Sequence, residues 1–113
     1  MTRPAWLLIA CACAACAKRD ARSLAQSYVE LIALGKTDDA AKLHCASLGG
    51  VLHPFQSALA VSTVDHDRER WCVEGTVTLD DKRGSSVAID IWDERGLCIK
   101  AVRVFGSCKP RTR

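Results

Sequence analysis

WCVEGTVTLDDKRGSSVAIDIWDERGLCIKAVRVF, residues 71–105, is the stretch of the chain that decides the fold. Its apolar residues alternate with polar ones, which is the period of a half-buried β-strand. Strands are predicted there over Trp71–Leu79, Ser85–Asp93 and Leu97–Phe105, and the same period over Ala58–Asp65 predicts one more before them. The connections are short and polar, so the strands are expected to form an antiparallel meander.

The register of these strands follows from the lengths of the connections. We expect Asp93 to pair with Leu97, and Leu79 to pair with Ser85. Because paired residues point to the same side of a sheet, one side of this sheet should be apolar. Its predicted members are Trp71, Val73, Val77, Leu79, Val87, Ile89, Ile91, Leu97, Ile99 and Ala101. An apolar face of this size needs a covering layer.

The residues before the sheet supply that layer. From Leu24 onward apolar residues recur every three or four positions, which predicts an amphipathic helix over 20–34. A second helix is predicted over 38–48, with Thr37 as its N-cap. The expected fold class is therefore α+β: two N-terminal helices packed on one face of a curved four-stranded antiparallel meander.

Residues 1–16 are predicted to be a secretory or lipoprotein leader. Arg3 precedes an uncharged run that extends to Ala17, and this arrangement is typical of a signal peptide. The run is shorter than the ~20 apolar residues that span a bilayer. A small residue before a cysteine resembles the lipobox of bacterial lipoproteins, in which the cysteine is acylated. Cys16 is the predicted acylation site and Cys11 the alternative. Cleavage by a conventional signal peptidase would instead release a soluble, secreted or periplasmic protein.

The remainder of the chain is predicted to hold one domain. The 113 residues are enough for one domain and too few for two. We expect a tether over 17–20, a single α+β domain over 21–108 and a basic tail over 109–113. The formal net charge is +3, from 16 Lys and Arg against 13 Asp and Glu. Because charges of both signs are interspersed, nucleic acid is not an expected partner.

Three phrases carry a resemblance to a known group. They are LIALGKTDDAAKL at 31–43, EGTVTL at 74–79 and GLCIKAVRV at 96–104. In this order they resemble the cystatin-like or nuclear transport factor 2-like superfamily, and most of all its small bacterial lipoproteins of unknown function. The similarity covers about 21–105, although Leu97 stands where an aromatic residue usually begins the last strand. It implies a cone-shaped helix-on-sheet fold, and it implies no particular activity.

The domain keeps an even number of cysteines: Cys45, Cys72, Cys98 and Cys108. In an exported chain they are predicted to form structural disulfides. The absence of a Cys-x-x-Cys spacing among them disfavours a zinc or redox centre, so no metal and no cofactor are expected. The predicted register places Cys72 and Cys98 about 9.6 Å apart, beyond the about 7 Å that a disulfide allows. The pairing is otherwise left open, and a bulge near Lys100 would change it.

The histidines are weak candidates for chemistry. His44 lies beside a cysteine, and His53 precedes a proline. His66 stands between Asp65 and Asp67, an arrangement that can orient an imidazole or contribute to a metal site. We interpret this Asp-His-Asp as a solvated turn.

No catalytic residue is predicted. Glu74, Asp90 and Lys100 fall in one row of the polar sheet face, where they are expected to form a cross-strand charge ladder rather than an acid–base set. Tyr28 is the one polar-tipped candidate that faces the space between helices and sheet. The sequence shows no nucleophile elbow, phosphate-binding glycine loop or metal-ligand motif.

The functional hypothesis is therefore a non-enzymatic, exported domain. It would be anchored to the membrane through its acylated cysteine and would bind an unknown protein or small ligand. The alternative is a small enzyme or ligand carrier with a site in the cone between helices and sheet. A third possibility is a partner surface on the outer sheet face, around Val61, Trp92, Val102 and Val104.

Overall fold

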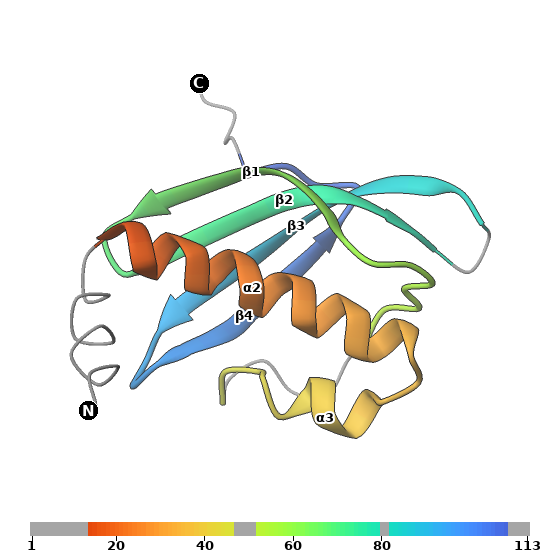
Figure 1. The fold of residues 1–113 in the computed structure, drawn as a ribbon, viewed down its shortest axis with the longest axis horizontal. Helices are drawn as coiled ribbons and strands as arrows, with labels where there is room; N and C mark the ends of the chain where they lie inside the picture. The colour runs from red at the N-terminus through yellow and green to blue at the C-terminus, as the bar shows by residue number, and fades with distance from the viewer. Residues whose placement is uncertain (1–13, 47–51, 80–81, 109–113) are drawn as a thin grey trace, which may run out of the picture.

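A computed structural model describes residues 14–46, 52–79 and 82–108 (Figure 1). Within these ranges, two helices are followed by four strands in chain order. The elements are α2 (Ala14–Ala33), α3 (Thr37–Ala41), β1 (Ala60–Asp67), β2 (Arg70–Thr78), β3 (Gly84–Asp93) and β4 (Leu97–Val104). The strands form one antiparallel sheet in the order β1-β2-β3-β4. The predicted α+β class, with helices and a curved antiparallel meander, is confirmed.

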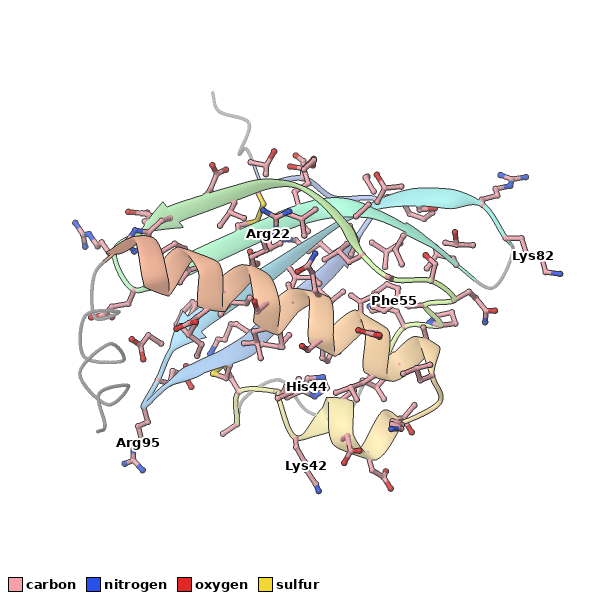
Figure 2. The ribbon with its side chains drawn as sticks, viewed as in Figure 1. Arg22, Lys42, His44, Phe55, Lys82 and Arg95 are labelled. Atoms are coloured by element: carbon pink, nitrogen blue, oxygen red, sulfur yellow. A yellow bond between two sulfur atoms is a disulfide. The ribbon has the colours of Figure 1, made fainter. Side chains whose placement is uncertain are left out.

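Helix α2 lies across one face of the sheet, and the core fills the space between them (Figure 1). The exposure of β2 and β3 alternates along each strand, because side chains of successive residues point to opposite faces. The buried members of the core are Ala21, Ala25, Tyr28, Val29, Ile32, Ala40, Phe55, Leu59, Trp71, Val73, Val77, Leu79, Val87, Ile89, Ile91 and Ile99. We call this side of the sheet the inner face and the opposite side the outer face. Figure 2 shows Phe55 beside the segment that leads into β1, whereas Lys42, Lys82 and Arg95 project away from the layers.

Both predicted helices have different bounds in the structure. Helix α2 begins at Ala14, so residues 17–20, expected as a tether, are helical. Alanine, lysine and arginine are strong helix formers, and no breaker separates this stretch from the helix that follows. Helix α3 ends at Ala41, well short of the predicted bound at 48. Its N-cap position is Lys36, with no side-chain cap, so Thr37 is the first helical residue and not the cap.

The early end of α3 has a tertiary cause. After the helix, the chain runs parallel to β4, and an isolated bridge joins His44 to Ile99. The amide of Cys45 donates to the carbonyl of Ile99 at 2.7 Å, and the amide of Ile99 donates to the carbonyl of Leu43 at 2.8 Å. These hydrogen bonds satisfy backbone groups at the edge of β4. They would stay unpaired if residues 43–45 continued the helix. Pairing with a distant strand overrides the local helical pattern here.

The predicted register is correct at one hairpin and wrong at the next. Asp93 pairs with Leu97 across a connection that ends in Gly96, as expected. Between β2 and β3, however, Thr78 pairs with Gly84, so the predicted pairing of Leu79 with Ser85 is wrong by two positions. A shift of two keeps every side chain on its predicted face. The inner face is therefore right along these strands although each partner differs.

A bulge in β4 changes which residues face inward. Ile91 pairs with Ile99, but Asp90 pairs with Ala101, so Lys100 is an extra residue in the strand. Beyond it, Val102 and Val104 pack against the core and Ala101 does not belong to the inner face. The predicted apolar outer patch is therefore wrong, since Val102, Val104 and also Val61 pack on the core cluster.

The first hairpin is tighter than the sequence suggested. Strand β1 continues to Asp67, which pairs with Arg70 across a two-residue turn. Arg68 opens the turn with φ 63, in the left-handed region that two-residue hairpins require. The predicted turn at Asp65-His66-Asp67 is therefore wrong, because these residues are the end of a strand. Arginine and glutamate at the turn give none of the usual Asn-Gly or Asp-Gly signal.

Candidate functional site

The inner layer contains one polar pair, Tyr28 and His44. The hydroxyl of Tyr28 is hydrogen-bonded to Nε2 of His44 at 2.8 Å, and their ring centroids lie 5.4 Å apart. Tyr28 is fully buried on α2, and His44 reaches it from the segment paired with β4 (Figure 2). Burial raises the pKa of Tyr28 from its ordinary value of 10.0 to about 12.

This pair has the character of a satisfied buried hydrogen bond. A tyrosine with a raised pKa stays protonated at neutral pH, so it is a poor general base. The other members of the core cluster are apolar, and Ser85 of β3 is the buried polar residue beside them in the described chain. Tyr28 therefore lies between helix and sheet, as predicted, and its hydroxyl is hydrogen-bonded to His44. His44 was expected within the second helix, but it lies after the end of α3.

A pocket of about 370 Å³ lies at the end of the sheet near the β1–β2 turn. Its lining comes from three strands and from the segment after β4. The residues are Asp65, His66, Asp67, Arg70, Trp71, Cys72, Asp90, Trp92 and Cys108. Most of them alternate with the buried core residues and so belong to the outer face. We call this cavity the outer-face pocket.

Cations hold the aromatic wall of the pocket. The guanidinium of Arg70 lies 4.5 Å from the ring centroid of Trp92, and the ammonium of Lys100 lies 4.3 Å from it. Arg70 pairs with Trp92 in the sheet, whereas Lys100 comes from the bulge of β4. Both contacts are cation–π interactions, which keep this half-buried ring in place. On the other side, His66 stacks on Trp71, with centroids 3.8 Å apart.

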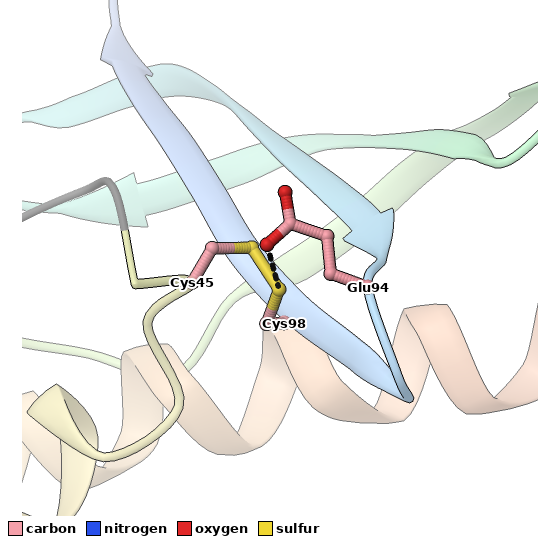
Figure 3. A group of neighbouring side chains, drawn as sticks. All are labelled: Cys45, Glu94 and Cys98. Atoms are coloured by element: carbon pink, nitrogen blue, oxygen red, sulfur yellow. Dashed lines mark hydrogen bonds between the residues drawn. A yellow bond between two sulfur atoms is a disulfide. The ribbon is translucent and has the colours of Figure 1, made fainter.

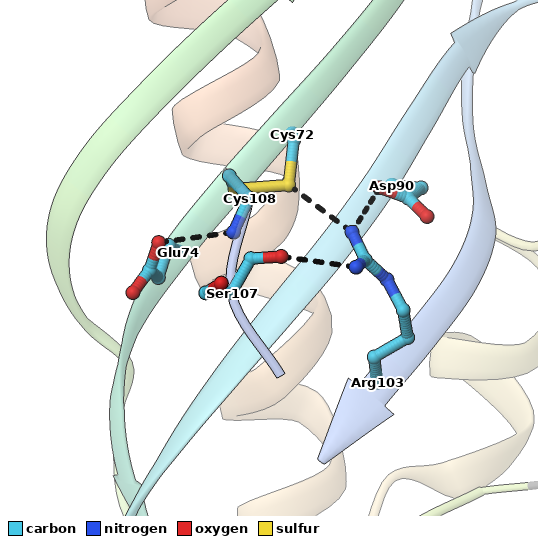
Figure 4. Close-up of polar contacts among 6 residues, drawn as sticks. All are labelled: Cys72, Glu74, Asp90, Arg103, Ser107 and Cys108. Carbon is cyan, nitrogen blue, oxygen red and sulfur yellow. Dashed lines mark hydrogen bonds and ion pairs between the residues drawn. A yellow bond between two sulfur atoms is a disulfide. The ribbon is translucent and has the colours of Figure 1, made fainter. Parts of the chain in front are cut away.

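The remaining wall is built by the chain after β4 (Figure 4). A disulfide joins Cys72 to Cys108, and the amide of Cys108 donates to Oε1 of Glu74 at 3.1 Å. Arg103 donates from Nη1 to the carbonyl of Ser107 at 2.9 Å and from Nη2 to Asp90 at 2.9 Å. These contacts fasten residues 107–108 across the outer face. We call them, with the disulfide, the tail clasp.

The lining of the pocket is acidic. Its lining includes three aspartates and one arginine, and two more cations lie beside it, Lys100 over the Trp92 ring and Arg103 on Asp90. Asp90 is paired with Arg103, but no ion pair involves Asp65 or Asp67 within the part of the chain that the structure describes. Nor do these carboxylates converge closely enough to form one of the metal-ligand groups found among the described residues. The pocket therefore offers charge without a chelating geometry.

A different group of donors lies at the edge of β4 (Figure 3). Cys45 and Cys98 form a disulfide, with Cα atoms 4.9 Å apart. Sγ of Cys98 lies 3.9 Å from Oε1 of Glu94, and the other carboxylate oxygen bonds the ammonium of Lys100 at 3.4 Å. The sulfurs and one Glu94 oxygen all lie within 4.8 Å of one another.

The predicted charge ladder is wrong. Glu74 pairs with Ala88, and Asp90 pairs with Cys72 and Ala101, so the three charges do not share a row. Lys100, the extra residue of the bulge, turns to Glu94 instead. The register error of two and the bulge together explain the difference, because each changes which outer-face residues are neighbours.

The other site predictions have mixed outcomes. The expected disulfides are present, as Cys45–Cys98 and Cys72–Cys108, and the disfavoured Cys72–Cys98 pairing does not occur. His53 contacts Phe55, with ring centroids 6.0 Å apart. Cys16 falls within α2, and Cys11 lies outside the described residues.

Sequence reasoning missed the outer-face pocket. Its members are spread over β1, β2, β3 and the chain end, and they meet only when the pairings are known to the residue. The Asp-His-Asp run was a usable signal, and it was interpreted as a turn. A first strand extended by two residues, to Asp67, would have placed Asp67 opposite Arg70, which in turn pairs with Trp92.

Comparisons of the chain with protein-family models, with curated proteins and with solved structures find no match. Function must therefore be inferred from the side chains that the fold brings together. Among the described residues, neither helix combines the length and the apolar character needed to cross a bilayer.

Proposed function

We infer that this protein is an exported, lipid-anchored and non-enzymatic binding domain, and that its ligand site is the outer-face pocket. The fold we propose is that of the cystatin-like or nuclear transport factor 2-like superfamily, as a small bacterial lipoprotein. The observation that carries the proposal is a pocket of about 370 Å³ with polar and aromatic lining, most of which lies on the face opposite the packed core. Pockets of this size and mixed lining suit small ligands.

Export is supported by the leader and by the cysteines. The uncharged run up to Ala17 is typical of a signal peptide, and disulfides persist in oxidising compartments outside the cytosol. Acylation would fall on Cys16, with Cys11 as the alternative. Acyl chains would then hold the domain at the membrane surface.

The position of the anchor relative to the pocket favours a ligand near the membrane. Ala21 of α2 is fully buried, only a few positions after Cys16 in the chain. Figure 1 shows the start of α2 at the same end of the sheet as the β1–β2 turn, where Asp67 and Arg70 line the pocket. A lipid on Cys16 would therefore keep the pocket close to the bilayer.

The lining favours a ligand that carries positive charge. Asp65 and Asp67 supply carboxylates without an ion-pair partner among the described residues. Trp92 contacts two cations of the chain itself, so a cationic ligand that reached this ring would take the place of one of them. A nucleic acid would meet the wrong sign of charge here.

The rival reading places an enzyme or carrier site between helices and sheet. It receives less support, because that layer is the apolar core and its polar pair, Tyr28 and His44, is joined by a hydrogen bond. An enzyme site needs convergent polar groups that can reach a substrate.

The test has two parts. Mass spectrometry of the mature N-terminus in the native host should find an acylated Cys16, and an unmodified terminus would contradict the anchor. For the pocket, amide and indole NMR shifts of the full chain would be followed with choline, inorganic phosphate and glucose as probes. We expect choline to shift the indole signals of Trp71 and Trp92 and the amides of Asp65 and Asp67.

The double variant Asp65→Asn, Asp67→Asn should lose the choline response, whereas Asp38→Asn, an exposed carboxylate on the distant α3, should keep it. Shifts centred on Tyr28 would support the rival site instead. If none of the three probes shifts any residue of the pocket, the outer-face pocket is not the binding site.

A further inference from the structure

The edge of β4 brings together three side chains whose donor atoms suit a metal ion. They are Cys45, Glu94 and Cys98, and their donor atoms lie within 4.8 Å of one another. It is the one group of this kind among the residues that the structure describes. The cysteines are separated by 53 positions in the chain, so no short sequence motif indicates this group of ligands.

The backbone holds these residues in place independently of the disulfide. Two hydrogen bonds pair the Leu43–Cys45 segment with Ile99, next to Cys98. Glu94 stands in the tight connection that leads into β4, where its amide donates to the carbonyl of Gly96 at 3.0 Å. The donors would therefore stay close to one another if the sulfur–sulfur bond were opened.

The tail clasp provides an internal contrast. Cys72 and Cys108 also form a disulfide with carboxylates nearby. There, however, Glu74 accepts the amide of Cys108, and the guanidinium of Arg103 lies 3.5 Å from the sulfur of Cys72. A fixed cation beside the sulfur opposes a second cation, and no metal-ligand group is found at that site.

We propose that the reduced protein binds one thiophilic divalent cation, Zn²⁺ being the expected one, through the thiolates of Cys45 and Cys98 and the carboxylate of Glu94. The disulfide first takes up two electrons and two protons from a dithiol or phosphine reductant, which leaves two thiols. Zn²⁺ then replaces the thiol protons, which pass to solvent. Two thiolates, one carboxylate and one water complete the four positions that zinc prefers.

The disulfide and the metal site exclude each other. Thiolate is the ligand form of cysteine, and sulfurs bonded to one another offer none. Oxidation of the two thiolates would therefore release the metal, and a bound metal would protect Cys45 and Cys98 from oxidation. The site is a redox-controlled metal site, independent of whether the outer-face pocket binds a ligand.

Substitutions at Glu94 and at Lys100 should change the metal affinity in opposite directions. Glu94 supplies a ligand oxygen, and its second oxygen bonds the ammonium of Lys100 at 3.4 Å. Loss of the carboxylate in Glu94→Gln should weaken binding by at least about tenfold, in line with the sensitivity of metal sites to their supporting groups. Lys100→Gln removes a cation from the site and should strengthen binding several-fold.

The experiment uses Co²⁺ as a spectroscopic substitute for Zn²⁺ in the full chain under anaerobic conditions with a phosphine reductant. So that no other thiol can contribute a ligand, two reciprocal variants are compared, each with all other cysteines changed to Ala. One keeps only Cys45 and Cys98, and the other keeps only Cys72 and Cys108. We expect the first to show thiolate-to-cobalt charge-transfer absorption that saturates at one ion per chain and is displaced by Zn²⁺.

The second variant should show no saturable thiolate–cobalt band, and the oxidised form of the first should show none. Far-ultraviolet circular dichroism follows the fold of each sample. Equal absorption in the two variants, or affinity unchanged by Glu94→Gln, would refute the site. The proposal also fails if the reduced Cys45–Cys98 variant is unfolded and Zn²⁺ does not restore its folded spectrum.

Discussion

The two disulfides fasten different parts of the fold by different means. Cys45–Cys98 joins the segment after α3 to the edge of β4, where backbone pairing with Ile99 already holds the chain. Cys72–Cys108 joins the end of the described chain to the outer face, where side chains of Glu74 and Arg103 provide the other contacts. The first bond reinforces the layers that make the core. The second makes a wall of the outer-face pocket.

This difference shows that a disulfide's contribution depends on what it fastens. At the edge of β4, Cys45 is buried and belongs to the same region as Tyr28 and His44. At the tail clasp, the contacts are partly exposed, and exposed polar contacts contribute little. Loss of the first bond should therefore affect global stability, and loss of the second should affect mainly the pocket.

The largest effect is expected for Cys45→Ala with Cys98→Ala. The bond closes a loop of 53 positions, for which the chain-entropy model gives about 4 kcal/mol. We expect a loss near this value in the free energy of unfolding, measured by urea denaturation under non-reducing conditions. A loss below about 1 kcal/mol would show that backbone pairing with Ile99 alone fastens this edge.

Cys72→Ala with Cys108→Ala should cost less, about 2–3 kcal/mol in the same measurement. The chain-entropy term for its 36 positions is nearly as large. It is offset because residues 107 and 108 regain conformational freedom once released, worth about 1 kcal/mol for each of these two residues. The choline response at Trp92 should weaken in this variant and persist in the first one. The reverse pattern would contradict the assignment of the clasp as a pocket wall.

The same two regions show which features the sequence could predict. The period of two predicted the strands β2, β3 and β4, and it predicted the inner face of β2 and β3, because burial on one side imposes alternation wherever the strand is regular. The connection ending in Gly96 gave the correct register, because Arg95 and Gly96 adopt positive φ there, as glycine-containing hairpin loops do.

The sites depended on features with no local signal. The bulge at Lys100 inverts the facing of the rest of β4, and the early end of α3 brings Cys45 to Cys98. Both are consequences of pairing between distant segments, which competes with local propensity and can override it. The cysteines were therefore recognised as disulfide partners, and their connectivity was not.

The environment of Tyr28 can be tested through the pH dependence of the free energy of unfolding. Its pKa is about 12 in the folded protein against 10.0 ordinarily, so between these values the unfolded chain loses the proton while the folded protein keeps it. Stability should therefore fall as pH rises from 10 to 12, by about 2 kcal/mol in total. Tyr28→Phe should remove this part of the slope, at a cost of about 1 kcal/mol near pH 7 for the lost bond to His44.

The measurement is a series of urea unfolding curves between pH 8 and pH 12, in which wild type and Tyr28→Phe are compared at each pH. The lysines and the disulfides respond to alkali in both proteins, so only the difference between them reports on Tyr28. A constant difference across the range would show that the hydroxyl ionises as readily in the folded protein as in the unfolded chain.

The smallest effect is expected at the tail clasp, for Arg103→Gln. The side chain bonds Asp90 and the carbonyl of Ser107, but it is exposed, and exposed ion pairs contribute roughly 0.2–1 kcal/mol. We expect a loss in that range, diminished further by high salt because exposed charges are screened. A loss above about 2 kcal/mol, independent of salt, would place this guanidinium in a desolvated network and would remove the contrast between the two regions.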